Sequence, residues 1–203
     1  TSSANYTVNQ LALTGTITGG SSVYGSVLSP GTVGFSNLIA NDVVTPASIT
    51  VNTVGLLSSS HLKAGTHTGI QSVSGTLSGT DAANYSFAGA SADYTVAQLA
   101  LTGAAIAPVT TTYGTTAAAG AVSFTNVFSG DAVSSTASIV NPLTSSSGNL
   151  KAGSYSQNAA ATLTGNDAGN YSFTGFTTSS ANYTVNQLAL TGTITGGSSV
   201  YGS

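Results

Sequence analysis

Histidine, lysine and aspartate are the side chains of this sequence best suited to metal binding or covalent chemistry, and all three are rare. His61 and His67 lie close together and have the side-chain type of a metal pair. A related passage further along the chain carries Asn149 and Tyr155 at the corresponding positions. Because the second passage lacks both imidazoles, we expect the two histidines to be solvated loop or strand residues, and we predict no metal ligand.

Aspartate occurs in a recurring turn passage. Asp81 lies in "GTDAANYSF" and Asp167 in "GNDAGNYSF", where the aspartate and the asparagine three residues later offer oxygen atoms to a calcium ion. One carboxylate is too few for a cation that takes six to eight oxygen ligands. We therefore predict Asx turns that close hairpins, and we expect Asp42 and Asp131, in "AND" and "SGD", to be turn residues of the same kind.

The remaining motif search predicts no catalytic residue, no cofactor-binding residue and no enzymatic activity. The G-x-S-x-G elbow, any G-x-G triplet and cysteine are missing. Lys63 and Lys151, both in "LKAG", are the only cations besides histidine, and they leave no basic surface for nucleic acid. A lysine–asparagine amide crosslink is a further hypothesis for these two residues. No apolar run approaches the roughly 18 residues of a membrane span.

These residues belong to a repeat that dominates the sequence. The first 26 residues, "TSSANYTVNQLALTGTITGGSSVYGS", return unchanged at the end of the chain, displaced by 177. Tyr6 recurs as Tyr94 and Tyr183 at spacings of 88 and 89 residues, and "YG", "LKAG" and "DAxNYSF" recur in the same order. A unit of about 88 residues therefore occurs twice, which predicts a window of a longer array that alternates between two kinds of unit.

The passage "NYTVNQLALTG" predicts two strands with opposite inward faces. Tyr6 and Val8 share one face, whereas Leu11 and Leu13 have the opposite parity. We therefore predict that the last strand of one domain runs directly into the first strand of the next, with the two pairs in separate cores. The predicted interdomain junction residues are Tyr6, Val8, Leu11, Leu13, Tyr94, Val96, Leu99, Leu101, Tyr183, Val185, Leu188 and Leu190.

Composition predicts an all-β fold. Thr, Val, Tyr and Phe favour strands, Gly, Asn and Ser favour turns, and Glu and Arg are missing. We predict small tandem β-sandwich or β-grasp-like repeat domains of about 88 residues joined end to end. A parallel β-helix is the alternative, but it needs a shorter period. The predicted segments are a terminal strand of a preceding repeat at 1–10, repeat domain A at 11–98, repeat domain B at 99–187 and the first strands of the next repeat A at 188–203.

The "YG" after the first strand, the "GxDAxNYSF" turn and the closing "NYTV" together resemble the MBG and YDG-type repeats of large Gram-negative surface proteins, including filamentous-haemagglutinin-like adhesins. The resemblance covers the whole chain as two units with flanks. It implies an exported, β-rich stalk or fibre at the bacterial cell surface. The sequence departs from the usual pattern at "NQLALTG", where many such repeats have a proline-containing junction.

Two functions follow as expectations. The first is a structural segment of an extracellular adhesin stalk or filament, whose partners are neighbouring repeats of the same polymer, with strands exchanged between units. The alternative is a binding module that recognises cell-surface glycans or a host surface through Tyr24, Tyr113 and Tyr155. Neither function needs a cofactor, nucleic acid or a membrane span in this segment.

Overall fold

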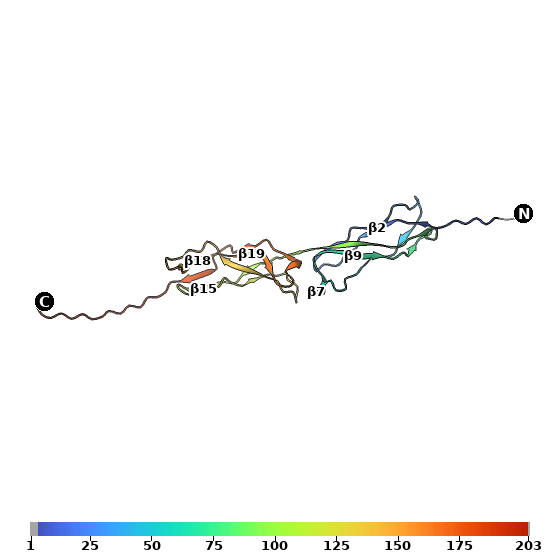
Figure 1. Cartoon of the computed structure of the whole chain (residues 1–203). Coiled ribbons are helices and arrows are strands. Elements are labelled where there is room, and N and C mark those ends of the chain that lie inside the picture. Colours follow the sequence, from blue (N-terminus) through green and yellow to red (C-terminus); the bar gives the residue numbers. More distant parts are fainter. Residues whose placement is uncertain (1–3, 203) are drawn as a thin grey trace. The chain divides into compact units, whose positions relative to one another are not determined.

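The computed structural model describes residues 4–202 and divides them into two compact units, each of which is coloured along the chain in Figure 1. Unit 1 contains residues 4–102, 125–134 and 163–173, and unit 2 contains residues 103–124, 135–162 and 174–202. These units do not follow the predicted borders at residues 98 and 187. Segments 125–134 and 163–173 of the predicted domain B belong to unit 1, because their side chains pack against Tyr24.

Strands are the main regular structure. They make up 40% of the chain against 3% helix, which confirms the all-β prediction. The helix consists of two short 3-10 segments at the "DAxNY" turns, η1 (Ala82–Asn84) and η2 (Ala168–Asn170). Among residues 4–202, no helix is long and apolar enough to cross a membrane.

The strands of unit 1 are short except for β9 and β12. They are β1 (Leu11–Ala12), β2 (Gly15–Thr18), β3 (Ser21–Val23), β4 (Thr32–Phe35), β5 (Thr45–Pro46), β6 (Thr50–Val51), β7 (Leu57–Ser58), β8 (His61–Leu62), β9 (Gly65–Val73), β10 (Leu77–Ser78), β11 (Tyr85–Ser86), β12 (Ala90–Ala97), β13 (Leu99–Ala100) and β20 (Tyr171–Ser172).

The remaining strands lie wholly or mainly in unit 2. They are β14 (Ala105–Ile106), β15 (Val109–Thr112), β16 (Val122–Ser123), β17 (Ser134–Ile139), β18 (Gly153–Tyr155), β19 (Gln157–Thr164), β21 (Phe176–Thr177) and β22 (Tyr183–Asn186).

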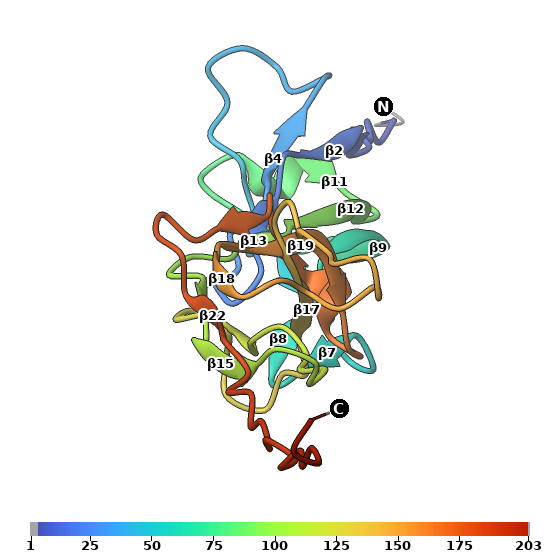
Figure 2. The same ribbon diagram turned by 90° about the vertical axis from the view of Figure 1, so that its left-hand side faces the viewer.

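The largest sheet of unit 1 has the order β3-β12-β9-β6, with β9 and β12 labelled in Figure 2. β12 pairs in parallel with β3 and antiparallel with β9. Tyr94 and Val96 of β12 are buried and Thr95 between them is exposed, as the alternating pleat of a half-buried strand requires. This sheet brings the Tyr24 turn, which follows β3, beside the end of β12.

Unit 2 contains a sheet with the same pairing. β22 lies between β15, which is parallel to it, and β18, which is antiparallel. Tyr183 and Val185 of β22 are buried, like Tyr94 and Val96 of β12. A second three-stranded sheet of order β17-β19-β21 completes the unit's larger strand groups.

A fully buried glutamine, Gln71, forms hydrogen bonds to three chain segments in unit 1. The Gln71 amide nitrogen donates to the carbonyl of Gly19 at 3.1 Å and to that of Asp93 at 2.6 Å, and its oxygen accepts from Gly31 N at 2.7 Å. A side chain at Gly20 would collide with this amide, since its Cβ would lie 2.4 Å from Gln71 Nε2. The buried amide therefore has both donors and its acceptor satisfied.

Gln157 has the same role in unit 2 and is also fully buried. Its nitrogen donates to Ala107 O at 3.1 Å and to Asn182 Oδ1 at 2.9 Å, and its oxygen accepts from Gly120 N at 2.6 Å. Each half of the sequence thus builds its own buried glutamine network. No sequence motif predicted either glutamine.

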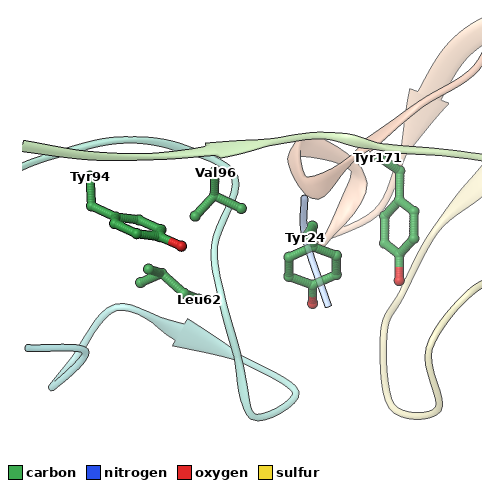
Figure 3. Packing of buried hydrophobic residues seen from close by; sticks show 5 residues of the cluster. All are labelled: Tyr24, Leu62, Tyr94, Val96 and Tyr171. Atoms are coloured by element: carbon green, nitrogen blue, oxygen red, sulfur yellow. The ribbon is translucent and has the colours of Figure 1, made fainter. Parts of the chain in front are cut away.

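One apolar cluster in unit 1 holds five buried residues, which Figure 3 shows: Tyr24, Leu62, Tyr94, Val96 and Tyr171. Leu99 and Leu101 pack against the same cluster. The prediction of separate cores on the two sides of the junction therefore fails here. The reason is Tyr24, which lies between Val96 and Tyr171 and joins the two sides (Figure 3).

Candidate functional site

The most elaborate side-chain arrangement in unit 1 surrounds Tyr24, and we call it the Asp131 site. It consists of Tyr24, His61, Phe128, Asp131 and Tyr171. The Tyr24 ring makes T-shaped contacts with Tyr171 at a centroid distance of 5.3 Å and with Phe128 at 5.7 Å. His61 lies 4.4 Å from the Phe128 ring and 5.6 Å from the Tyr24 ring. These edge-to-face contacts fix the tyrosine ring as well as burying it.

Both tyrosine hydroxyls of the Asp131 site reach one carboxylate oxygen. Tyr24 donates to Asp131 Oδ2 at 2.8 Å and Tyr171 donates to the same atom at 2.6 Å. Figure 3 shows the two hydroxyl groups pointing to the same side of the cluster. Tyr171 also accepts a hydrogen bond from Phe128 N at 3.0 Å. Hydrogen bonds to an ionised acceptor are among the stronger ones in proteins.

These contacts shift the protonation equilibria of the site in opposite directions. Burial, assisted by the hydrogen bond to Asp131, raises the pKa of Tyr171 to about 12. The same two causes raise the pKa of Tyr24. Burial alone would raise the pKa of Asp131 as well, but the hydroxyls of Ser59, Tyr171 and Tyr24 outweigh it and lower this pKa. At neutral pH the site therefore holds two neutral phenols on an ionised carboxylate.

Further hydrogen bonds secure the "DAxNY" turn beside the Asp131 site. Asn170 is buried, and its Oδ1 accepts from Ala64 N at 2.9 Å. The hydroxyl of Ser58 donates to Asp167 Oδ1. Gln98, the single residue between β12 and β13, donates to Gly169 O at 3.0 Å. The β-strand that follows, β13, pairs in parallel with β20 through Leu99 opposite Tyr171.

A second arrangement of the same residue pattern lies elsewhere in unit 1, and we call it the Asp42 site. It consists of Ile39, Asp42, Asn84 and Tyr85. Tyr85 donates to Asp42 Oδ2 at 2.5 Å and accepts from Ile39 N at 3.4 Å. The hydrogen bond to Asp42, followed by burial, raises the pKa of Tyr85. Leu11 of β1 pairs in parallel with Tyr85 of β11, as Leu99 does with Tyr171.

The Asp42 site differs from the Asp131 site in having a hollow where the first tyrosine would be. A cavity of about 300 Å³ adjoins the site, and its lining includes Ile39, Asp42, Asn84, Tyr85 and Val8. Ile39 is 58% exposed, and Asn84 is exposed where its counterpart Asn170 is buried. Each site contains an aspartate that accepts a hydrogen bond from a tyrosine hydroxyl. Only the Asp131 site has a second tyrosine ring, that of Tyr24, packed against this pair.

The predicted junction residues fall into groups with different environments. Those on β12 and β22 are buried, namely Tyr94, Val96, Tyr183 and Val185, and so is Leu13. Leu99 and Leu101 are half-buried. The others are exposed, namely Tyr6 at 91%, Val8 at 80%, Leu11 at 41%, Leu188 at 53% and Leu190 at 90%.

Several expectations for single side chains are corrected. His61 lies on strand β8, but it is only partly solvated, because it packs on Tyr24 and Phe128. His67 sits on β9 and its Nε2 lies 2.7 Å from Lys63 O. Both lysines are exposed, so neither has the burial that an amide crosslink would need. Residues 4–202 contain no group of three or more His, Cys, Asp or Glu side chains that could hold a metal ion.

The aspartates predicted to form local Asx turns bind distant groups instead. Asp81 Oδ2 accepts from Val43 N at 2.8 Å, and neither Asp81 nor Asp167 makes a side-chain cap at its 3-10 segment. Asp42 and Asp131 accept tyrosine hydroxyls. The turn carboxylates act as long-range connectors because the folded chain brings donors to them from other strands.

The three tyrosines predicted as possible glycan contacts differ in their exposure to solvent. Tyr24 is 1% exposed and Tyr155 is 8% exposed, so neither can present a ring to a ligand. Tyr113 is half-buried and adjoins a hollow of about 330 Å³. Two members of the Asp131 site were missed. Tyr171 carried a usable signal, since it recurs as Tyr85 at the same place in the repeat, but Phe128 did not, since its counterpart is Ile39.

Comparison with protein-family models, curated proteins and solved structures finds no significant match to this chain.

Proposed function

We propose that this chain is a structural segment of an exported bacterial stalk or extracellular filament, built from tandem β units of about 88 residues. The observation that carries the proposal is the Asp131 site. There the tyrosine of the first "YG" is buried on a phenylalanine, an aspartate and a tyrosine that come from the second copy of the repeat. One copy of the repeat thus completes the packing of the other, as neighbouring units of a tandem array do.

The chain path near Gln98 supports the same function. β12 and β13 are separated by this one residue, whose side chain is itself hydrogen-bonded to Gly169 O. A one-residue connection whose side chain is hydrogen-bonded has little freedom to bend, unlike the long Gly/Ser linkers that behave as flexible coils. Secretion and a place on the cell surface are part of the proposal, as the resemblance to MBG and YDG-type repeats suggests.

Immunogold electron microscopy of the native producing cells tests this function. Antibodies against the 203-residue chain should decorate regular extracellular fibres at repeated intervals. Label confined to the cell interior, or to surface material without fibres, would contradict the proposal. Comparison with pre-immune serum provides the control for nonspecific labelling.

A glycan-binding module remains a second candidate because of Tyr113. Its half-buried ring, with Ala152, Leu188 and Leu190, borders the hollow of about 330 Å³, and aromatic faces beside such hollows are typical of sugar sites. A glycan array probed with the wild-type chain and with Tyr113→Ala separates the two functions. Specific binding that disappears in the variant would favour the module, and an array without signal would favour the stalk.

A further inference from the structure

We propose that the Asp42 site binds the Tyr113–Gly114 turn of a second copy of this chain, with Tyr113 in the position that Tyr24 has in the Asp131 site. The inference deepens the proposed structural function by naming the partner and the contact. It depends on that function only for its biological setting.

The Asp131 site shows how this fold binds a tyrosine–glycine turn. Tyr24 inserts its ring beside Tyr171 and donates its hydroxyl to Asp131. The next residue, Gly25, has φ +81, and a Cβ there would lie 2.1 Å from Phe128 Cε2. The glycine is therefore needed both for the backbone conformation and for the close approach of the phenylalanine.

The Asp42 site offers the receiving half of the same contact. Asp42 and Tyr85 form the carboxylate–phenol pair, and Ile39 stands where Phe128 stands in the other site. The adjoining cavity of about 300 Å³ is bordered by all three residues. Burial of an aromatic ring in such a cavity is the usual anchor of a protein interface, and its hydroxyl would meet an acceptor that already faces the cavity.

The Tyr113–Gly114 turn offers the inserting half. Tyr113 N donates to Asn186 O at 2.8 Å, as Tyr24 N donates to Ala97 O at 2.9 Å, so both turns leave a parallel strand in the same way. Gly114 has φ +87, close to that of Gly25, and a Cβ there would meet no atom of residues 4–202 within 4 Å. The space that Phe128 fills beside Gly25 is thus open beside Gly114.

A second pair of groups matches across the proposed contact. In the Asp131 site, buried Asn170 accepts a hydrogen bond from Ala64 N. The equivalent residues are Asn84, which is exposed and borders the cavity of the Asp42 site, and Ala152, which is exposed and borders the hollow beside Tyr113. Docking would bring Ala152 N of one copy to Asn84 Oδ1 of the other, and would cover both hollows at once.

The duplicated passage explains how a second copy can enter the site. A docking copy carries its own β22, with Tyr183 and Val185 already buried in its sheet. The equivalent residues at the start of the receiving copy, Tyr6 and Val8, are 91% and 80% exposed, so their displacement costs little free energy. The contact is heterologous, since one copy gives the turn and the other gives the site, and such contacts repeat into rings or open filaments.

Sedimentation velocity of the full chain over a range of concentrations up to about 1 mM tests the contact. We expect the wild type to self-associate, and Tyr113→Ala and Asp42→Ala each to weaken association by roughly 30-fold or more, as the loss of an interface anchor does. Tyr201→Ala is the matched control, because Tyr201 also precedes a glycine but is fully exposed, and it should associate like the wild type.

Mixing the two variants gives the decisive result. The Asp42→Ala chain keeps an intact turn and the Tyr113→Ala chain keeps an intact site, so an equimolar mixture should form a dimer and no larger species. That result also shows that both variants are folded. A wild type that stays monomeric at the highest concentration, variants that associate like the wild type, or a mixture that stays monomeric would each overturn the proposal.

The docking and the proposed function can fail separately. Self-association that follows these rules, together with immunogold label inside the cell, would contradict the stalk and leave the contact standing. Fibres on the cell surface whose chain shows no association through Asp42 and Tyr113 would contradict the contact alone.

Discussion

The Asp131 site and the Asp42 site are built from the same repeat, yet one is filled and the other is open. Both place an aspartate on a tyrosine hydroxyl, through Tyr171 in one case and Tyr85 in the other. Only the Asp131 site has a further ring, that of Tyr24, over this pair. In both sites the carboxylate–phenol pair is assembled within one copy of the repeat, whereas in the Asp131 site the covering tyrosine comes from the other copy.

Truncation of the covering tyrosine should break the comparison most strongly. Tyr24→Ala removes a ring that is 1% exposed, so we expect a loss of about 3–5 kcal/mol in the free energy of unfolding. Tyr113→Ala, the same change in the second copy, should cost less in the monomer, about 1–2 kcal/mol, because that ring is only half-buried against the cluster of Tyr155 and Tyr183. Urea unfolding followed by far-UV circular dichroism at low protein concentration measures both values.

One outcome of the urea experiment would contradict this prediction. Equal losses for the two variants would show that Tyr113 is as firmly packed as Tyr24 within a single chain, and the distinction between the filled and open sites would no longer hold. Tyr24→Phe separates the contribution of the ring from that of the hydroxyl.

Replacement of the two carboxylates should give the next largest difference. Asp131→Asn weakens the hydrogen bonds of two tyrosine hydroxyls, and we expect a loss of about 2–3 kcal/mol in the free energy of unfolding. Asp42→Asn affects one hydroxyl beside a hollow and should cost about 1 kcal/mol. The same urea experiment measures the two changes, and a larger loss for Asp42→Asn would contradict the assignment of Asp131 as a shared acceptor.

Protonation of Asp131 at low pH should lower the free energy of unfolding by less than the Asp131→Asn substitution does. The folded-state pKa of Asp131 is lowered from its ordinary 3.8, so its ionised form stabilises the fold above that pH. This contribution is lost as the pH falls through the lowered pKa. Unfolding free energies measured from about pH 6 down to about pH 2 should therefore decline less in Asp131→Asn than in the wild type. Asp42→Asn is the control, since it keeps Asp131, and an identical decline in all three proteins would contradict the prediction.

The sequence was sufficient for the all-β fold class, because this follows from short-range patterns of residue type. It also located the turns at Asp42 and Asp131. It could not show that these carboxylates bind tyrosines, because the donors are distant in sequence. Tyr24 is 107 residues from Asp131, and Tyr171 is 40 residues from it. Only the fold brings these residues together.

The same reasoning explains the error at the junction. Side-chain parity predicted Tyr94 and Leu99 on opposite faces of a continuous chain, and from that we predicted two cores. Parity gives the direction of each side chain, but it does not show which other side chains fill the space between them. The rings of Tyr24 and Tyr171, in contact at 5.3 Å, span the gap and make one cluster.

The smallest expected effect concerns a feature that the two sites share. Gln98 donates to Gly169 O and Gln10 donates to Ala83 O, both at 3.0 Å and both on the exposed surface. Because a solvent-accessible hydrogen bond of this kind contributes about 0.5–1 kcal/mol, Gln98→Ala and Gln10→Ala should each lower the free energy of unfolding by that amount and no more. Matched losses would place the difference between the sites in the covering tyrosine rather than in the chain that leads to it. A much larger loss for Gln98→Ala would instead show that the fastened connection between β12 and β13 contributes to the filled site, and the proposed docking would then need that connection as well as the tyrosine.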